Sequence, residues 1–134
     1  MKRLILAVFF LTTLILPASA ADKANAVLVH PGEVVYARFE AKGKKIKLVS
    51  FSKEKDEGAQ VVFSLQLDAK KPVQVLKVEN KFNRDLTYKV EMRSLTRKQQ
   101  FPVPVTPVVG GKVAFENFPL QAEELAAYDF QLEK

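Results

Sequence analysis

The chain has little of what catalytic and metal sites use. Among its 134 residues there is no cysteine and no tryptophan, and there are one histidine (His30) and two methionines. Without a thiol, disulfides and cysteine nucleophiles are excluded. A serine–histidine–acid triad could use only His30, which adjoins Pro31 and has no partner in the local sequence. After residue 20 a single methionine remains, too few soft or imidazole ligands for copper or zinc.

The acidic residues add no catalytic or metal site. The stretch Glu54-Lys55-Asp56-Glu57 lacks the alternating oxygen ligands and the glycine of a calcium loop. Two carboxylates at the right distance define a glycoside hydrolase without any sequence motif. Such enzymes need a cleft, however, and the missing tryptophan removes a common platform for stacking sugars. The sequence therefore predicts a protein that is not an enzyme and that has no metal and no cofactor.

The N-terminal segment is the strongest positive signal. Residues 1–20 begin with Lys2 and Arg3, continue as a 14-residue apolar run broken only by two threonines, and end in Ala18-Ser19-Ala20. This is the three-part pattern of a secretory signal peptide, here of bacterial type. The run is short for a membrane span, which needs about 20 residues. Since no cysteine follows, lipid attachment is excluded. We expect cleavage after Ala20, no membrane span in the mature protein, and a periplasmic or secreted location.

The remaining residues, 21–134, fit one domain. Residues 1–20 hold two of the 21 basic residues and no acid, so residues 21–134 carry 19 basic and 15 acidic residues, a net charge of +4. No linker, repeat or low-complexity tract divides them. Without cysteines, stability must come from packing alone, which favours a regular, well-packed architecture.

Alternation of apolar and polar residues predicts strands along this whole domain. We expect an all-β fold, an immunoglobulin-like antiparallel β-sandwich of about seven or eight short strands, with a small closed β-barrel as the alternative. Residues 86–92 alternate best and are predicted to form a central strand, whereas residues 121–126, rich in Glu and Ala, are predicted to form a helical turn. The expected strands are 26–30, 33–41, 45–52, 61–67, 73–78, 86–92, 101–107, 112–118 and 127–132.

Two further expectations concern packing. In the segment FPVPVTP, Pro102 and Pro104 remove N–H donors from one edge of an extended chain, which is typical of a protected edge strand. A proline-rich recognition segment is the other interpretation, but the alternating apolar residues favour a strand. The residues predicted to form the core are Phe63, Leu65, Tyr88, Val90, Val105, Phe115 and Phe130.

Two short stretches carry a resemblance. The pattern V-x-N-x-F-N-x-x-L-T-Y-x-V-x-M at 78–92 resembles the turn and strand of many immunoglobulin-like bacterial envelope domains. The pattern E-x-A-x-Y-x-F at 124–130 is similar to the corner that places a tyrosine before a core strand in that superfamily. The resemblance covers about a fifth of residues 21–134, and no strand can follow the second pattern as the usual order requires. It implies the sandwich fold and no particular activity.

Charge supplies the one candidate site. Between residues 42 and 57 six lysines stand against three acids, and alternation places Lys45 and Lys47 on the solvent face. Such a surface attracts anionic envelope polymers or an acidic protein, although lysines also guard ordinary sheet edges. Nucleic acid is not an expected partner, because arginines are few and the location is wrong. The predicted partner-binding residues are Lys42, Lys44, Lys45, Lys47, Lys53 and Lys55.

These observations leave two classes of function. The first is a non-catalytic binding or accessory module that contacts an envelope protein or polymer through a sheet edge or the lysine-rich hairpin. The second is a secreted enzyme inhibitor or a carrier of a small apolar ligand, which needs an exposed loop or a cavity. A filled core with an open edge favours the first class, and an apolar cavity favours the second.

Overall fold

The computed structural model describes residues 25–68, 70–71, 73–94, 99–119 and 122–133. Over these residues the chain is all-β, as predicted, and contains no helix; the segment predicted as a signal peptide lies outside them. Every strand pairing is antiparallel. The strands are β1 (Val27–Val29), β2 (Val34–Lys42), β3 (Lys45–Ser52), β4 (Val61–Leu67), β5 (Gln74–Asn80), β6 (Leu86–Ser94), β7 (Gln100–Val103), β8 (Val113–Phe118) and β9 (Ala122–Leu132).

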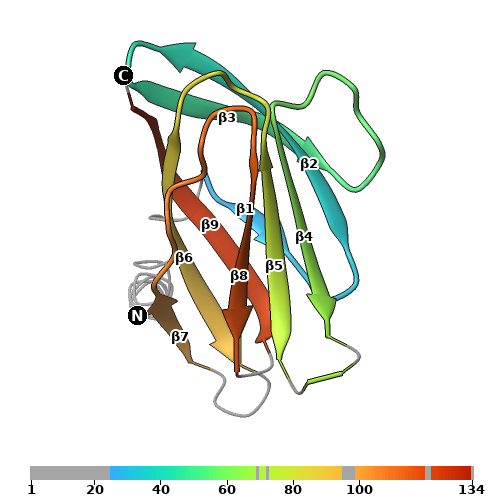
Figure 1. Ribbon diagram of the computed structural model, residues 1–134. Helices are drawn as coiled ribbons and strands as arrows, with labels where there is room; N and C mark the ends of the chain where they lie inside the picture. Colours follow the sequence, from blue (N-terminus) through green and yellow to red (C-terminus); the bar gives the residue numbers. More distant parts are fainter. Residues whose placement is uncertain (1–24, 69, 72, 95–98, 120–121, 134) are drawn as a thin grey trace, which may run out of the picture.

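The strands form one curled sheet. Its order is β7-β6-β9-β3-β2-β4-β5-β8, and β1 pairs with β9 beside this path. Figure 1 shows the sheet curling so that β4, β5 and β8 lie across from β6 and β9. Among the described residues no pairing joins β7 to β8, so the sheet is a half-barrel with two ends. The antiparallel all-β prediction is confirmed at this level.

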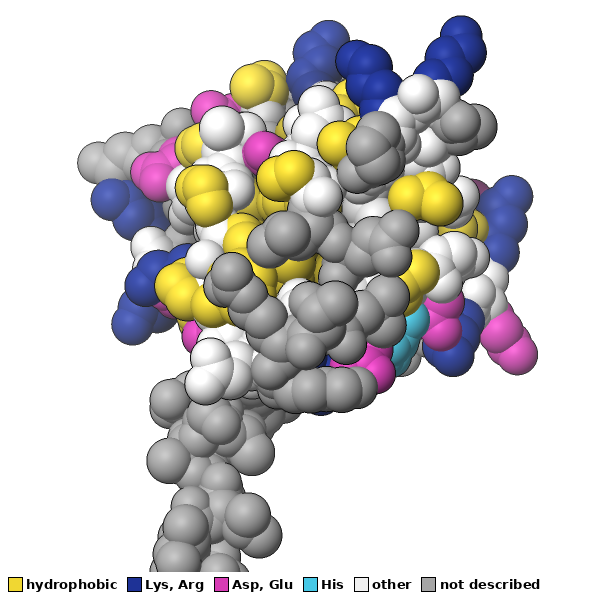
Figure 2. Space-filling view, turned by 90° about the horizontal axis from the view of Figure 1, so that it is seen from below, with side chains coloured by type: hydrophobic (Ala, Val, Ile, Leu, Met, Phe, Trp, Pro, Cys, Tyr) yellow, Lys and Arg dark blue, Asp and Glu magenta, His cyan; other side chains and the backbone are white. Residues whose placement is uncertain are grey.

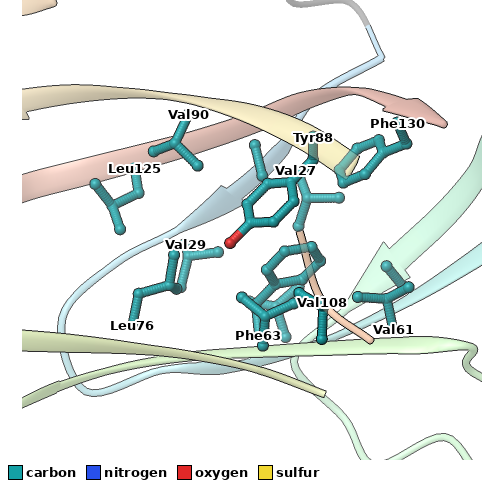
Figure 3. Packing of buried hydrophobic residues seen from close by; sticks show 14 of the residues in the cluster. Val27, Val29, Val61, Phe63, Leu76, Tyr88, Val90, Val108, Leu125 and Phe130 are labelled. Carbon is teal, nitrogen blue, oxygen red and sulfur yellow. The ribbon is translucent and has the colours of Figure 1, made fainter. Parts of the chain in front are cut away.

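The core fills the hollow of the half-barrel (Figure 3). Five of the seven predicted core residues are buried in it: Phe63, Leu65, Tyr88, Val90 and Phe130. Val105 is half-buried and packs against the cluster. The prediction for Phe115 is wrong, because its side chain is 62% exposed. It lies on the outer face of β8, at one end of the sheet, while the alternate residues Ala114 and Phe118 face the core.

Tyr88 is the polar exception inside this core. Its ring stacks on Phe130, with centroids 6.3 Å apart, and meets the ring of Phe63 edge-on. Its buried hydroxyl, visible in Figure 3 among apolar side chains, has no hydrogen-bond partner among the described residues. Burial also raises the pKa of Tyr88. The ring stabilises the fold, whereas the unpaired hydroxyl costs free energy that a phenylalanine would not.

The predicted helical turn at 121–126 is also wrong. From Ala122 onward these residues belong to β9, which pairs with β6 along almost its whole length. The Glu- and Ala-rich composition favours a helix only weakly, and a run this short does not hold a helix in isolation. Cross-strand pairing and burial of Leu125 and Ala127 therefore decide the conformation.

Burial in β4 departs from strict alternation at three positions. Alternation with Phe63 and Leu65 would turn Val62 and Ser64 toward solvent and Leu67 inward, but Val62 and Ser64 are buried and Leu67 is 59% exposed. Val62 pairs with Tyr36 of β2, and Ser64 pairs with Lys77 of β5. These larger neighbours shield the outer face of β4, which lies between two long strands. Leu67 lies at the end of β4, beyond the pairing with β2.

Two other predictions concern strand position. β6 has a neighbour on each side, β7 and β9, but it lies one place from the end of the sheet rather than at its centre. β7 is the protected edge strand that Pro102 predicted, since β6 is its only partner among the described strands. Phe101, Val103 and Val105 turn their apolar side chains toward the core.

Candidate functional site

Half of the predicted lysines line a groove between β3 and β9. Among the described residues the two strands pair only where Lys45 faces Gln131, and β1 pairs with the same edge of β9 at residues 125–127. Beyond Lys45, β3 therefore leaves β9, and a groove of about 500 Å³ opens between them. We call it the lysine groove; its lining residues are Asn25, Glu40, Lys42, Lys45, Ile46, Lys47, Leu48, Tyr128, Asp129, Phe130 and Gln131.

A bulge in β9 forms one wall of this groove. Thr87 of β6 faces Gln131, but Lys89 faces Tyr128, so β9 has one residue more than β6 in this interval. Asp129 adopts a φ of 55°, in the left-handed region that is uncommon for a residue other than glycine. A bulge bends its strand and changes which residues face inward. The buried side therefore passes from odd positions, such as Leu125, to even ones, such as Phe130.

The opposite wall is the β2–β3 hairpin, whose tip is tied to the end of β9. Gly43 has a φ of 66°, which the tight turn requires of its first central residue. The amide of Leu132 donates a hydrogen bond to the carbonyl oxygen of Lys44. Arg84 donates to the carbonyl oxygen of Gly43 at 3.1 Å and to that of Glu133 at 2.8 Å. Both walls therefore belong to the folded scaffold.

The six predicted lysines fall into two groups. Lys42, Lys45 and Lys47 line the groove, and Lys44 is exposed at the adjoining turn. The other two lie beyond the far end of β3 and pair with acids. Lys53 lies 2.7 Å from a carboxylate oxygen of Glu33, and Lys55 lies 3.3 Å from one of Glu57. The structure thus brings four of the six to one end of the hairpin and places two elsewhere.

The charges of the groove are not balanced internally. Its two acids already have cationic neighbours, Lys42 at 3.9 Å from Glu40 and Lys89 at 3.3 Å from Asp129. Lys45 and Lys47 have no ion pair with any described residue. Ile46 is buried between them, and the bordering residues Leu48 and Phe130 are half-buried and buried. Two ammonium groups without an acid partner among the described residues therefore stand over an apolar floor.

A second hollow lies at the other end of β3. It measures about 320 Å³, and we call it the His30 pocket. Its apolar lining comes from Leu28, Val35 and Phe51, and its polar lining from His30, Glu33, Ser52 and Lys53. It lies between β1 and β3, as the lysine groove does at its Asn25 end.

His30 lies in a chain of charged groups beside this pocket. Its Nδ1 lies 3.0 Å from Glu33 Oε1 and its Nε2 lies 2.9 Å from Glu124 Oε2. Arg93 then approaches Glu124 at 3.6 Å. In Figure 2 the histidine, in cyan, lies at the surface beside acidic side chains in magenta. The hydrogen bond from Lys53, together with those from His30, holds the pKa of Glu33 below its usual value.

The sequence reading missed these partners of His30. Glu33 is three residues from His30, so its carboxylate could have been recognised as a candidate partner from the sequence. Glu124 is 94 residues away, and no local pattern points to it. Each ring nitrogen faces a carboxylate, and both carboxylates also contact a cation, so the cluster joins the β1–β2 loop and the end of β3 to β6 and β9. Such an arrangement ties strands together electrostatically.

The loop after β3 is anchored by a second carboxylate. Arg38 donates two hydrogen bonds to Asp56, from Nε at 2.5 Å and from a terminal nitrogen at 2.6 Å. This guanidinium, and the amide of Gly58, hold the pKa of Asp56 below its usual value. Ala59 is buried, so the loop 53–60 is packed at its end.

Comparisons with known proteins do not assign this chain to a family. No protein-family model, no curated protein and no solved structure matches this chain. Within the described ranges there is no group of three or more histidine, cysteine or carboxylate residues suited to a metal ion. Those ranges also contain no helix of the length and hydropathy needed to span a membrane.

Proposed function

We propose that this protein is a non-catalytic binding module of the bacterial cell envelope, periplasmic or secreted, with an immunoglobulin-like sheet arrangement. It holds an anionic partner, an acidic envelope protein or an anionic polymer, in the lysine groove. One observation carries the proposal: Lys45 and Lys47 stand at the mouth of an open groove, over apolar side chains, without an acid partner among the described residues.

Physical chemistry favours an anion at this place. The attraction of one exposed lysine for an acid is small, about 0.2–1 kcal/mol. Four lysines at one end of a hairpin add their fields, and the apolar floor lowers the local dielectric. Attraction of this kind is screened over about 8 Å at physiological ionic strength. Binding must therefore weaken as salt rises.

The carrier alternative has less support. Both hollows are open grooves at the surface, and the core of the half-barrel is filled by side chains. A small apolar ligand would leave most of its surface in water in either groove, whereas sites for such ligands usually enclose them. The rim of lysines also suits a charged partner better than an apolar one.

The test measures binding of polyglutamate, a simple anionic polymer, to residues 21–134. The double variant Lys45→Gln with Lys47→Gln removes two exposed charges from the groove. We expect its affinity to fall by about tenfold at low salt, since two exposed charge contacts are lost. The unmodified protein should lose affinity steeply between low and physiological salt.

The matched control is Lys70→Gln with Lys71→Gln. These exposed lysines follow β4, at the end of the sheet opposite to the β2–β3 hairpin tip, and their loss changes the net charge by the same amount. We expect this control to bind almost as the unmodified protein does. If both double variants lose affinity equally, net charge rather than the lysine groove explains binding, and the proposal is wrong.

A further inference from the structure

β3 has one edge that is free within the described part of the chain. It pairs with β2 along its whole length, yet on its other side Lys45 alone among the described residues of β3 has a strand partner, Gln131. From Lys47 to Ser52, no described residue pairs with this edge of β3. An edge of this kind presents backbone donors and acceptors that an added strand can use.

The free edge borders a continuous seam between β3 and β1. Both strands pair antiparallel with β9, so β1 and β3 run in the same direction. The lysine groove opens at the start of the seam, between Asn25 and residues 45–48, and the His30 pocket opens further along, between Leu28 and Phe51. One extended chain laid along β3 passes both.

Exposed apolar side chains lie along the second half of β3. Val49 is 59% and Phe51 is 41% exposed. The pairing with β2 shifts between Arg38 and Phe39, where Val49 is the extra residue of a bulge. On β2, the partners of Lys47 and Phe51 are Glu40 and Ala37, three positions apart. Lys47 therefore shares the outer face with Glu40, and Phe51 shares the inner face with Ala37.

We propose that the lysine groove and the His30 pocket together bind one extended acidic segment of a partner protein, added as a strand to the free edge of β3. This inference rests on the proposed function and names its partner. An acidic side chain of the segment meets Lys45 and Lys47, and a large apolar side chain enters the His30 pocket. The two are three residues apart, about 10 Å, and point to opposite faces of the added strand.

Charge disfavours a second copy of this chain as the occupant. Two β3 edges paired antiparallel about Ser50 would place Lys47 of one copy opposite Lys53 of the other. Like charges directly opposite one another destabilise a strand pair. A segment with glutamate or aspartate at the matching position gains from the same lysines, so the edge selects acidic partners.

The first experiment separates backbone pairing from charge. The probe is a capped ten-residue peptide of threonine and serine with two glutamates and, three residues beyond the nearer glutamate, a phenylalanine. Two further versions carry N-methyl groups on alternate amides, one version for each edge of the peptide. We expect one methylated version to bind at least tenfold more weakly, because its donors toward β3 are blocked, and amide exchange to slow at residues 47–52 when the parent peptide binds.

If both methylated peptides bind as tightly as the parent, or if the slowed amides lie outside β3, the added-strand inference is wrong. The polyglutamate test of the lysines does not depend on this result. Suppose that the groove variant loses polyglutamate binding while N-methylation does not weaken peptide binding. The added-strand inference is then wrong, but the proposed function still holds.

The second experiment tests the apolar half of the site. Phe51→Thr should weaken the phenylalanine-containing peptide by several-fold and leave a peptide with serine at that place unchanged. Phe115→Thr is the control, because Phe115 is also exposed but lies on β8. Equal losses in both variants, or a loss with both peptides, would contradict the assignment of the His30 pocket.

Discussion

The edges of β7 and β3 are guarded in different ways. β7 ends the sheet, and Pro102 removes a backbone donor from its outer edge, while Pro104 follows directly after the strand. β3 keeps its backbone donors and acceptors along its free edge and is flanked by exposed lysines instead. Proline blocks any added strand, whereas lysine repels cationic and apolar partners and attracts acidic ones. The difference indicates that β7 is a closed edge and β3 a selective one.

The two edges also differ in the support behind them. β7 lies on β6, whose inward residues are among the most buried of the protein. The second half of β3 has no buried residue after Ile46. The closed edge at β7 thus lies against the packed core, whereas the selective edge at β3 has little buried side-chain support.

The largest expected effect on stability tests this difference in support. Val90→Ala should lower the free energy of unfolding by about 1–3 kcal/mol, because Val90 is buried behind β7 and the change leaves a partial cavity. Val49→Ala on β3 should change it by about 0.5 kcal/mol or less, since this side chain is 59% exposed. Denaturant unfolding measures both. Equal losses would show that β3 is packed as firmly as β7.

A second prediction concerns the prolines that protect the edge of β7. Pro102→Thr with Pro104→Thr restores backbone donors on that edge without adding charge. We expect concentration-dependent association that the unmodified protein lacks under the same conditions, measured by light scattering. Pro107→Thr, at an exposed position outside β7, serves as the control. If the double variant scatters as the control does, the prolines are not what keeps this edge unpaired.

The smallest expected effect is a response to acid on the β3 side alone. The folded pKa values of Glu33 and Asp56 lie below their usual values, so the stability they contribute is present at neutral pH and is lost as pH falls through those lowered values. Amide exchange at Gly58, whose N–H donates to Asp56, should speed up below about pH 4 before exchange in β7 does.

Asp56→Asn provides the comparison for that measurement. The variant removes the titrating group, so its loop should exchange faster at neutral pH and respond less to acid. A loop that stays as protected as before in the variant would show that the hydrogen bonds from Arg38 do not hold it.

Alternation predicted most of the strands but not every buried face. The β2–β3 hairpin and the β7 edge could both be predicted from the sequence, because a period of two and the position of glycine or proline act locally. The face of Phe115 could not, since both faces of β8 carry apolar residues and only its place at the end of the sheet decides which one meets the core. The helical turn at 121–126 failed because pairing with β6, at a distance of about 30 residues in the chain, overrides a weak local preference.

The sequence by itself determined the all-β class, the lack of disulfides, and the presence of many lysines in one hairpin, because composition and short-range alternation carry these properties. Tertiary structure alone decided which lysines share a groove, that His30 meets Glu124, and that β3 parts from β9 after Lys45. These depend on a bulge at Asp129 and on which strand takes the edge of β9, where residues distant in the chain compete for the same backbone hydrogen bonds. The outcome of that competition cannot be predicted from local sequence patterns.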